Sequence, residues 1–362
     1  MRRGDGAGER ITLIRLSALG DVVMLLPVLR ALTDRYPQLH ITLVSQPFVA
    51  ALAGQFPRVH FVGAALRGRH RGLGGMWRLA GDLLKAGAPG VVADMHSVLR
   101  TWLLTFFLRL RRWPHGLWCA RIDKGRAGKR ELTRAENKRM VQQAHSVERY
   151  AEVLRRLGYP VEVPCQLGGF AAGSHVVSVP PLGEGESLRV GMAPFAKHGG
   201  KIYPLERSYA VAQMLRSRGC QLFLFGSRGA EADVLSRWAQ ELGSGVVVPQ
   251  LGLDLSGELM LMHQLDAMLS MDSANMHLAS WAGVEVVSVW GATHPLAGFL
   301  GWGQRPDAVV QRDDLPCRPC SVFGNRPCAR GDFACMDIAP SVVAERVMMV
   351  ARRKRRISEE VR

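Results

Sequence analysis

The chain has 362 residues, of which 48% are hydrophobic and 22% are charged. This length exceeds one ordinary domain of ~100–200 residues, and the composition excludes a disordered chain. The net charge of +16 is uneven, because residues 1–180 carry 27 basic and 12 acidic residues (+15) and residues 181–362 carry 20 and 19 (+1). Such an excess in the first half favours an anionic partner there: a phosphorylated substrate, a membrane surface or a nucleic acid.

The sequence indicates a cytoplasmic chain. Met1-Arg-Arg is not followed by the apolar run of a secretory signal, and the most apolar segment, residues 102–113, is too short to span a bilayer. Seven cysteines without an export signal favour a reducing compartment. We therefore expect a soluble protein that can rest on the inner face of the cytoplasmic membrane.

Apolar strand patterns alternate with helical patterns along the chain, which predicts βαβ units and parallel sheets. In the first half, we expect strands at 11–16, 41–45, 59–62 and 91–94, and helices at 21–36, 76–85, 98–110 and 145–157. In the second half, we expect strands at 189–193, 221–225, 267–271 and 284–290, and helices at 205–217, 230–242, 273–282 and 341–353.

A segment rich in proline and glycine, residues 166–187, is the predicted linker. The domain plan is therefore an N-terminal Rossmann-like domain (1–165), the linker, a C-terminal Rossmann-like domain (188–340), and a C-terminal helix with a basic tail (341–362). Doubly wound halves bind ligands at the carboxyl ends of their strands, so we expect the site in a cleft between the halves.

The strongest motif in the second half is Ser270-Met-Asp-Ser-Ala-Asn-Met-His277, which follows a predicted strand. Asp272 is a suitable N-cap and Gly283 a suitable C′ residue for the next helix, whose free N–H groups would suit a diphosphate. His277 could reach the same ligand from within this motif. Thr293, which lies in a second loop after a strand, could also reach it. The competing interpretation is that Asp272 only caps the helix and His277 only packs.

Two further loops carry candidate chemistry. In Arg15-Leu-Ser-Ala-Leu-Gly-Asp21, the turn from Ser17 to Gly20 can bring backbone close to a substrate, and Asp21 could take a proton from a hydroxyl. The G-x-G-x-x-G dinucleotide fingerprint is absent, and a second helix cap is the competing interpretation of Asp21. The loop 196–204 holds Lys197 and Lys201, which could neutralise a leaving diphosphate or simply be solvated.

Taken together, these segments resemble the bacterial heptosyltransferases of lipopolysaccharide core synthesis, glycosyltransferase family 9. The resemblance covers nearly the whole chain in the expected order. The segments that carry it are residues 14–22, 94–100, 201–204, 271–278 and 290–295.

This resemblance implies a GT-B fold, that is, two Rossmann-like doubly wound parallel-sheet domains facing across a cleft. It implies an inverting, metal-independent transfer without a required cofactor, usually of a heptose from ADP-heptose to a lipopolysaccharide core or lipid A acceptor. The nucleotide-sugar donor would bind in the C-terminal domain and the anionic glycolipid acceptor in the N-terminal domain.

Site residues follow from the resemblance. Asp21 matches the general base and Lys201 a lysine that contacts the donor phosphate, with Lys197 as its rival. The other expected donor-binding residues are Asp272, Ser273, Asn275, His277, Thr293 and Glu231. The expected acceptor-binding residues are Ser17, Gly20, Asp94, Arg100, Lys129 and Arg130.

Residues 100–139 are unusually basic, with 12 basic and 3 acidic side chains. On the resemblance, this segment would meet phosphorylated glycolipid at the membrane, aided by interfacial aromatic groups. A solvated basic face over an ordinary core helix is the equally weighted alternative. The candidate basic contacts are Arg109, Arg111, Arg112, Lys124, Arg126, Lys129 and Arg130, and the aromatic ones are Trp102, Phe106, Phe107 and Trp113.

Four cysteines, Cys317, Cys320, Cys328 and Cys335, form a C-x₂-C-x₇-C-x₆-C cluster. They could hold a structural zinc ion, although free or redox-labile thiols are the favoured interpretation. Three other functions remain open: a GT-B transferase or epimerase that uses another nucleotide sugar, a non-catalytic scaffold, and a nucleic-acid-binding protein. The last is suggested by the pI of about 10.2, but no zinc-finger, helix-turn-helix or RNP motif supports it, so we expect no nucleic-acid partner.

Overall fold

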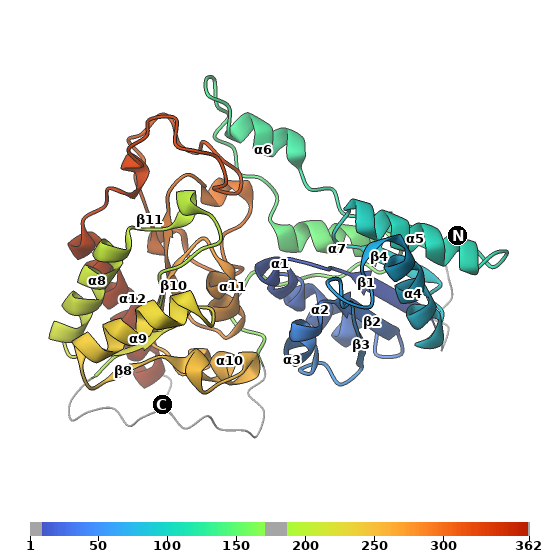
Figure 1. Ribbon diagram of the computed structural model, residues 1–362, viewed down its shortest axis with the longest axis horizontal. Helices are drawn as coiled ribbons and strands as arrows, with labels where there is room; N and C mark the ends of the chain where they lie inside the picture. Colours follow the sequence, from blue (N-terminus) through green and yellow to red (C-terminus); the bar gives the residue numbers. More distant parts are fainter. Residues whose placement is uncertain (1–8, 171–186, 361–362) are drawn as a thin grey trace. The chain divides into compact units, whose positions relative to one another are not determined.

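The computed structural model describes residues 9–170 and 187–360. These residues form two compact units, each built on its own parallel sheet (Figure 1). The first unit contains the chain up to Lys124 together with Ser146–Pro164, and the second contains Gly125–His145 and the chain from Cys165 onward. The predicted α/β class with two parallel sheets is therefore confirmed.

The first unit has a five-stranded sheet in the order β3-β2-β1-β4-β5, with every neighbouring pair parallel. Its strands are β1 (Arg10–Ile14), β2 (His40–Ser45), β3 (Val59–Gly63), β4 (Val91–Asp94) and β5 (Trp118–Arg121). Its helices are α1 (Leu19–Val23), α2 (Leu26–Arg35), α3 (Ala50–Ala53), α4 (Gly72–Lys85), α5 (Leu99–Arg111) and α7 (Ser146–Arg156).

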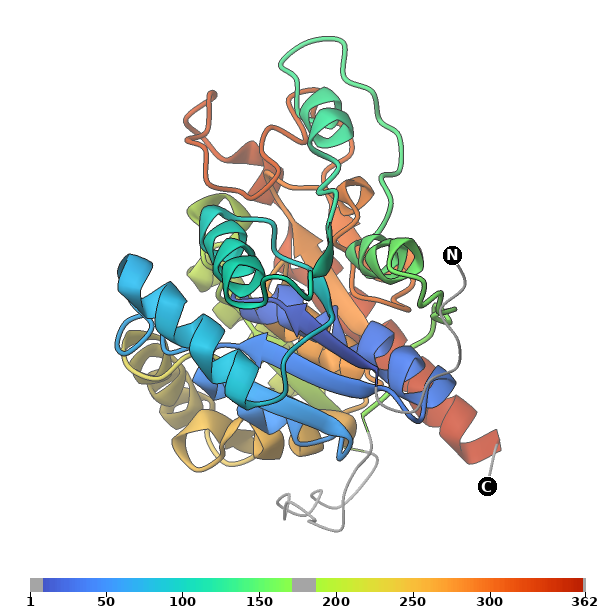
Figure 2. The ribbon, with the colours of Figure 1, turned by 90° about the vertical axis from the view of Figure 1, so that its right-hand side faces the viewer.

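Helices cover both faces of this sheet. Ile14, Val44 and Val92 face a buried cluster that contains Leu79 of α4 and Leu104 of α5. Figures 1 and 2 show α4 and α5 side by side on this face, and α2 and α7 on the other. The sheet is therefore buried on both sides, as parallel sheets usually are.

The predicted helix from Asp21 to about Tyr36 is in fact two helices, α1 and α2, separated at Met24–Leu25. Pro27 lies in the first turn of α2, where its missing N–H costs no helical hydrogen bond. The apolar periodicity continues through this break, so the sequence pattern predicts one helix. Asp21 lies in the first turn of α1, which begins at Leu19.

The second unit has a six-stranded parallel sheet in the order β11-β10-β9-β6-β7-β8. Its strands are β6 (Arg189–Ala193), β7 (Gln221–Leu224), β8 (Val246–Val247), β9 (Ala267–Met271), β10 (Val286–Trp290) and β11 (Val309–Gln311). Its α-helices are α6 (Arg126–Leu132), α8 (Leu205–Ser217), α9 (Ala230–Leu242), α10 (Leu255–His263), α11 (Ala274–Trp281) and α12 (Pro340–Glu360). Short 3₁₀ turns occur at Pro47–Val49 in the first unit and at Gly199–Lys201, Pro249–Leu251, Pro295–Ala297, Pro306–Ala308 and Ala334–Met336 in the second.

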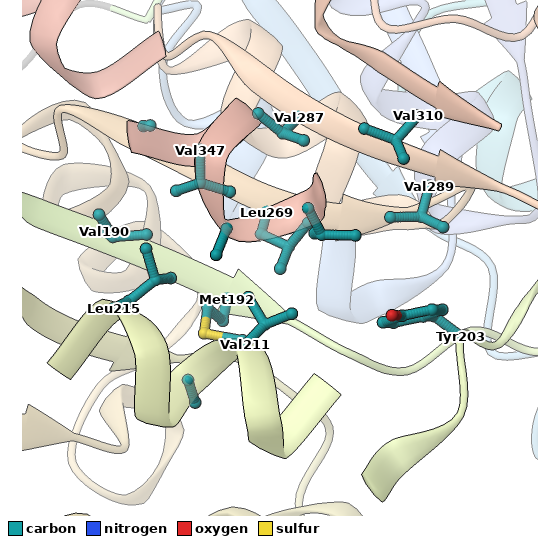
Figure 3. Close-up of a cluster of buried hydrophobic side chains, with 14 of the residues drawn as sticks. Val190, Met192, Tyr203, Val211, Leu215, Leu269, Val287, Val289, Val310 and Val347 are labelled. Carbon is teal, nitrogen blue, oxygen red and sulfur yellow. The ribbon is translucent and has the colours of Figure 1, made fainter. Parts of the chain in front are cut away.

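The second core lies between this sheet and the helices α8 and α12. Figure 3 shows Val190 and Leu269 of the sheet packed with Leu215 of α8 and Val347 of α12. The C-terminal helix, predicted as residues 341–353 outside the second domain, is longer and contributes its buried face to this core. It is thus an integral layer of the second unit.

Residues 125–145, which the sequence analysis assigned to the first domain, pack within the second unit. Nζ of Lys129 lies 3.9 Å from the centroid of the Phe299 ring. The backbone N–H of Gln143 donates to the carbonyl of Leu296 at 2.8 Å. Because these partners lie more than 150 positions later, no local pattern predicts them.

The predicted first domain ends at residue 165, and the boundary between the units lies between Pro164 and Cys165. Most of the predicted linker, residues 171–186, lies outside the described residues. Within the parts of the chain that the structure describes, no helix has the length and apolar character needed to cross a membrane.

Candidate functional site

The candidate site residues gather at one place in each sheet. Chain order reverses between β1 and β4 in the first sheet and between β6 and β9 in the second. Loops that leave the carboxyl ends of strands at such a reversal are where doubly wound folds bind ligands. We name the loops after β1 and β4 the first half-site, and the loops after β6, β9 and β10 the second half-site.

In the first half-site, Asp21 forms an ion pair with the guanidinium of Arg15. Arg15 is buried, and its Nη1 donates to the carbonyl of Met95 at 2.7 Å. The Asp21 side chain remains 30% exposed, and its Oδ2 also accepts the N–H of Ala18 at 3.3 Å. Asp21 therefore closes the first turn of α1 and still presents carboxylate surface to an incoming group.

Arg15 is held by more than this carboxylate. Its guanidinium lies 5.9 Å from the ring centroid of Tyr150, whose hydroxyl donates to the backbone carbonyl of Asp21 at 3.2 Å. Burial opposes the charge on Arg15, but Tyr150, Asp21 and Asp94 outweigh it and raise the pKa of Arg15. Arg15 is thus a fixed cation beneath the candidate base.

Asp94 is fully buried at the end of β4. Its carboxylate accepts the N–H groups of His96 and Ser97 at 3.0 and 2.8 Å and the hydroxyl of Thr101 at 2.8 Å, and Arg121 lies 3.4 Å away. These bonds shape the loop between β4 and α5. The geometry thus gives Asp94 a role in positioning this loop, and its part in acceptor binding stays a prediction.

The residue that this loop positions is His96, which lies in the segment 94–100 but is not among the predicted site residues. Nε2 of His96 lies 3.4 Å from Oγ of Ser17, so the two loops of the half-site meet here. Burial, together with Arg15 and Lys124, lowers the pKa of His96 to about 3. A neutral imidazole beside Asp21 can accept or donate a hydrogen bond to a hydroxyl without adding charge.

In the second half-site, Nζ of Lys201 lies 2.8 Å from Oδ2 of Asp272. Lys201 ends the 3₁₀ turn Gly199–Lys201 after β6, and Asp272 follows β9 directly. Asp272 is buried, and 14% of the Lys201 side chain is exposed. Because β6 and β9 are neighbours in the sheet, two motifs that lie about seventy residues apart in the sequence come together.

The predicted N-cap of α11 is wrong by one residue. Ser273 occupies that position, without a side-chain capping bond, because the Asp272 carboxylate turns to Lys201. Oγ of Ser273 lies 3.2 Å from Oγ of Ser270. The predicted C′ residue is confirmed, since Gly283 has a φ of +84° and follows the C-cap Ala282.

The first turn of α11 supplies N–H groups beside these side chains. Asn275 is partly exposed in that turn, and His277, two residues further along α11, is buried. Thr293, in the loop after β10, is fully buried, and its hydroxyl has no hydrogen-bond partner among the described residues. Buried hydroxyl groups are normally satisfied, so Thr293 is a candidate to bond a ligand.

A buried arginine far along the chain holds the loops of the second half-site. Arg318 donates from Nε to the carbonyl of Gly291 at 2.6 Å and from Nη2 to those of Trp290 and Thr293 at 3.0 and 3.1 Å. The loop after β10 is in turn bonded to the loop after β6, because Ala292 N–H donates to the Gly200 carbonyl at 2.9 Å.

Gly200 is required by this close approach. A Cβ on Gly200 would lie 2.8 Å from the carbonyl oxygen of Gly324 and 3.0 Å from Cβ of Ala292. No side chain fits there without moving backbone. The turn that carries Lys201 is therefore clamped between two loops.

The remaining predicted residues lie apart from these pairs. Lys197 is exposed, whereas Lys201 contacts Asp272, which distinguishes the two rivals. Glu231, in the first turn of α9, accepts the N–H of Ser227 at 2.6 Å. Arg100 and Arg130 are exposed, and Arg130 shares the second unit with the buried Lys129.

The structure provides no metal centre at the four cysteines. Cys317, Cys320, Cys328 and Cys335 are free thiols, and no group of three or more His, Cys, Asp or Glu able to hold a metal occurs in residues 9–170 and 187–360. Burial raises the pKa of Cys335 to about 11. The cysteine segment instead contributes Arg318, between two of its members, to the loops of the second half-site.

Comparisons with known proteins show the family and the fold. The model of glycosyltransferase family 9 (heptosyltransferase) matches residues 120–326, more than half of the chain. Lipopolysaccharide heptosyltransferase 1 of Pseudomonas aeruginosa is 26% identical over 321 residues, which are 86% of each chain.

Solved structures show the same fold. A glycosyl transferase of family 9 from Veillonella parvula superposes with a TM-score of 0.71 at 18% identity, covering 97% of this chain and 98% of its own. The E. coli heptosyltransferase WaaC, solved with ADP, gives a TM-score of 0.65 at 18% identity and covers 94% and 99%. The two parallel-sheet units are thus the pair of Rossmann-like domains of a GT-B protein, as predicted.

Proposed function

The chain belongs to glycosyltransferase family 9, the heptosyltransferase family, and from that premise we propose that it moves a heptose or related sugar from an ADP-sugar to a lipopolysaccharide core or lipid A acceptor. The proposed donor and acceptor classes are supported by the Pseudomonas aeruginosa relative, which is a lipopolysaccharide heptosyltransferase, and by the E. coli structure, which was solved with ADP.

One observation supports the chemistry most directly. Lys201 and Asp272 lie 2.8 Å apart at the head of α11, at the strand reversal of the second sheet. A lysine beside free helical N–H groups is a suitable site for a diphosphate. In this proposal Lys201 turns from Asp272 toward the donor phosphates, and Thr293 and Ser273 add neutral hydrogen bonds.

Asp21 acts as the general base in the proposed reaction. Its carboxylate accepts the proton of the acceptor hydroxyl while that oxygen bonds to the anomeric carbon of the donor sugar. The bond from this carbon to the diphosphate oxygen breaks, and the nucleoside diphosphate leaves with the electron pair. Attack from the face opposite to the leaving group inverts the anomeric configuration in one displacement.

Two groups of the chain stabilise the charge that develops. Positive charge from Lys201 and the N–H groups of α11 offset the growing charge on the diphosphate. Arg15 fixes Asp21 from below, and His96 with Ser17 is placed to orient the acceptor hydroxyl. The chain supplies these charges from its own side chains, which supports a transfer without a metal ion.

A binding experiment tests the donor class first. Purified protein is melted with ADP-, UDP-, GDP- and CMP-sugars, and we expect stabilisation by ADP-sugars of about 2.7 kcal/mol at a hundred times Kd. Preference for another nucleotide would replace the donor proposal.

A transfer assay then tests the acceptor. Incubation with ADP-heptose and truncated core glycolipid should give a glycolipid heavier by one heptose, with inverted anomeric configuration at the new bond. Donor hydrolysis or epimerisation alone, with no sugar on the glycolipid, would contradict the transfer proposal.

A further inference from the structure

Helix α5 has two apolar faces, of which only one is used by the fold. Thr101, Leu104, Thr105 and Leu108 are buried against the first unit. Five large apolar side chains of the same segment are nevertheless exposed, at relative accessibilities of 75, 52, 59, 57 and 81%: Leu99, Trp102, Phe106, Leu110 and Trp113.

These five residues form one continuous stripe. The four that lie in α5, Leu99, Trp102, Phe106 and Leu110, have spacings of three, four and four residues, which keep them within an arc of about 80° on a helix of 3.6 residues per turn. Trp113 follows two residues after the helix ends at Arg111. Two exposed apolar residues of the neighbouring α4, Leu73 and Trp77, extend the apolar surface. Trp77 packs edge-on against Phe107, so the two helices share this surface. We call these seven exposed side chains the α5 surface.

Basic side chains border the stripe on both sides. Helical geometry places Arg100 and Arg111 on one flank and Arg109 on the other. Arg112 follows at the end of the helix, and no acidic residue occurs between Leu99 and Trp113. The guanidinium of Arg111 lies 3.8 Å from the centroid of the Trp77 ring, which keeps this cation at the edge of the apolar surface.

A row of exposed tryptophan, phenylalanine and leucine with flanking arginines fits one occupant by its chemistry. Apolar side chains of this kind enter the boundary between headgroups and acyl chains, and arginines attract anionic headgroups. The helix is about 20 Å long, too short to span the ~30 Å hydrocarbon core. An interfacial orientation is therefore the one that buries the stripe and leaves the arginines solvated.

We propose that the α5 surface docks the protein on an anionic lipid bilayer, with the stripe inserted at the interface and Arg109, Arg111 and Arg112 at the headgroups. This surface lies within the first unit. The proposed membrane contact is smaller than the whole basic region 100–139. It leaves out Arg126, Lys129 and Arg130, because these residues belong to the second unit. Phe107 is not part of the proposed membrane contact, since it packs between α4 and α5.

Co-sedimentation with vesicles tests the proposal. The full chain is mixed with phosphatidylcholine vesicles with or without phosphatidylglycerol, at about 0.05 M and about 0.5 M salt. We expect binding to the anionic vesicles that weakens at least 10-fold at high salt. Phe106→Ser with Trp113→Ser should reduce binding at least 10-fold, and Arg109→Gln with Arg112→Gln should remove most of the salt dependence.

Matched variants keep the result interpretable. Leu251→Ser with Ile357→Ser changes two exposed apolar residues of the second unit and should bind like the wild type. Circular dichroism and a thermal melt establish that each variant is folded. The proposal is overturned if the Phe106/Trp113 variant binds as the wild type does, or if that variant converts a dimer to a monomer while neither protein binds vesicles. Vesicle binding needs no sugar donor, so it can fail or succeed independently of the transfer assay.

Discussion

The two half-sites have the same architecture but expose opposite charges. Each lies at a strand reversal, and each pairs an aspartate with a basic side chain. In the first, the cation Arg15 is buried and 30% of the Asp21 side chain is exposed. In the second, the carboxylate Asp272 is buried and the cation Lys201 is the more exposed partner. One half-site therefore exposes its carboxylate, and the other exposes its positive charge.

The choice of cation follows the same division. Arginine is a planar fork that bonds two partners at once, and Arg15 does so with Asp21 and the Met95 carbonyl. Lysine has a flexible stem and a single ammonium group, so Lys201 can exchange Asp272 for a phosphate oxygen. Arg15 thus holds Asp21 in position, whereas the flexible Lys201 suits the proposed role of binding a ligand that arrives and leaves.

The largest effect on turnover is expected from removal of the proposed base, Asp21. Asp21→Ala should lower turnover by about 10²–10⁴-fold, because the acceptor hydroxyl loses its proton acceptor. The affinity for the donor should not change, since the proposed donor site is the second half-site. Parallel measurement of kcat and of ADP-sugar Kd checks both statements. Unchanged turnover would remove Asp21 from the mechanism.

The complementary change in the second half-site should affect both quantities. Lys201→Met should lower kcat by about 10²–10³-fold and also weaken binding of ADP and ADP-sugars, because the diphosphate loses its cation. Calorimetric titration with ADP measures the second effect. A variant that loses turnover but binds ADP as the wild type does would show that Lys201 acts only in the transition state.

A smaller effect is expected when the positioning of the base is disturbed. Arg15→Lys retains the charge but cannot bond Asp21 and the Met95 carbonyl together, so kcat should fall about 10-fold. The donor Kd should stay constant. If kcat is preserved, the charge of Arg15 suffices and its geometry is irrelevant.

The buried imidazole of the first half-site makes stability depend on pH. The pKa of His96 is about 3 in the folded chain, below the ordinary value of 6.5, so the unfolded chain takes up a proton that the folded chain refuses. Stability should therefore fall as the pH drops from 6.5 toward 3. His96→Asn should reduce the loss between pH 7 and pH 5 by about 2 kcal/mol, as measured by urea unfolding. An equal loss in both proteins would show that His96 is accessible to protons.

The smallest effect serves as the control for Lys201. Lys197 belongs to the same loop but is exposed, so Lys197→Met should change kcat and donor Kd by less than about 2-fold. A loss comparable with that of Lys201→Met would reverse the assignment of the phosphate-binding lysine.

Local sequence patterns predict the sheets well, because buried parallel strands are short apolar runs with clear ends. The strands β4, β6 and β9 have the predicted boundaries, and their carboxyl ends carry the predicted motifs. Three of the four edge strands are not predicted: β5, β8 and β11 have four, two and three residues, whereas the edge strand β3 is predicted. Helix α10 was also missed, although Asp254 caps it by accepting the N–H of Gly257.

What the sequence could not reveal depends on long-range contacts. Nothing near Asp272 indicates that Lys201 competes for its carboxylate and leaves the capping position to Ser273. Nothing near Arg318 indicates that its guanidinium bonds three carbonyl groups between Trp290 and Thr293. Sequence motifs located the loops, but tertiary hydrogen bonds decide which side chain in each loop meets which partner.

The assignment of residues 125–145 to the second unit has a consequence for how this enzyme tolerates cleavage. The polypeptide crosses from one unit to the other three times, after Lys124, His145 and Pro164. A nick between His145 and Ser146 would leave two fragments that each hold part of both units, joined by buried non-covalent contacts. Separate production of the two fragments should accordingly allow them to reassemble, whereas no single cut yields two self-sufficient halves.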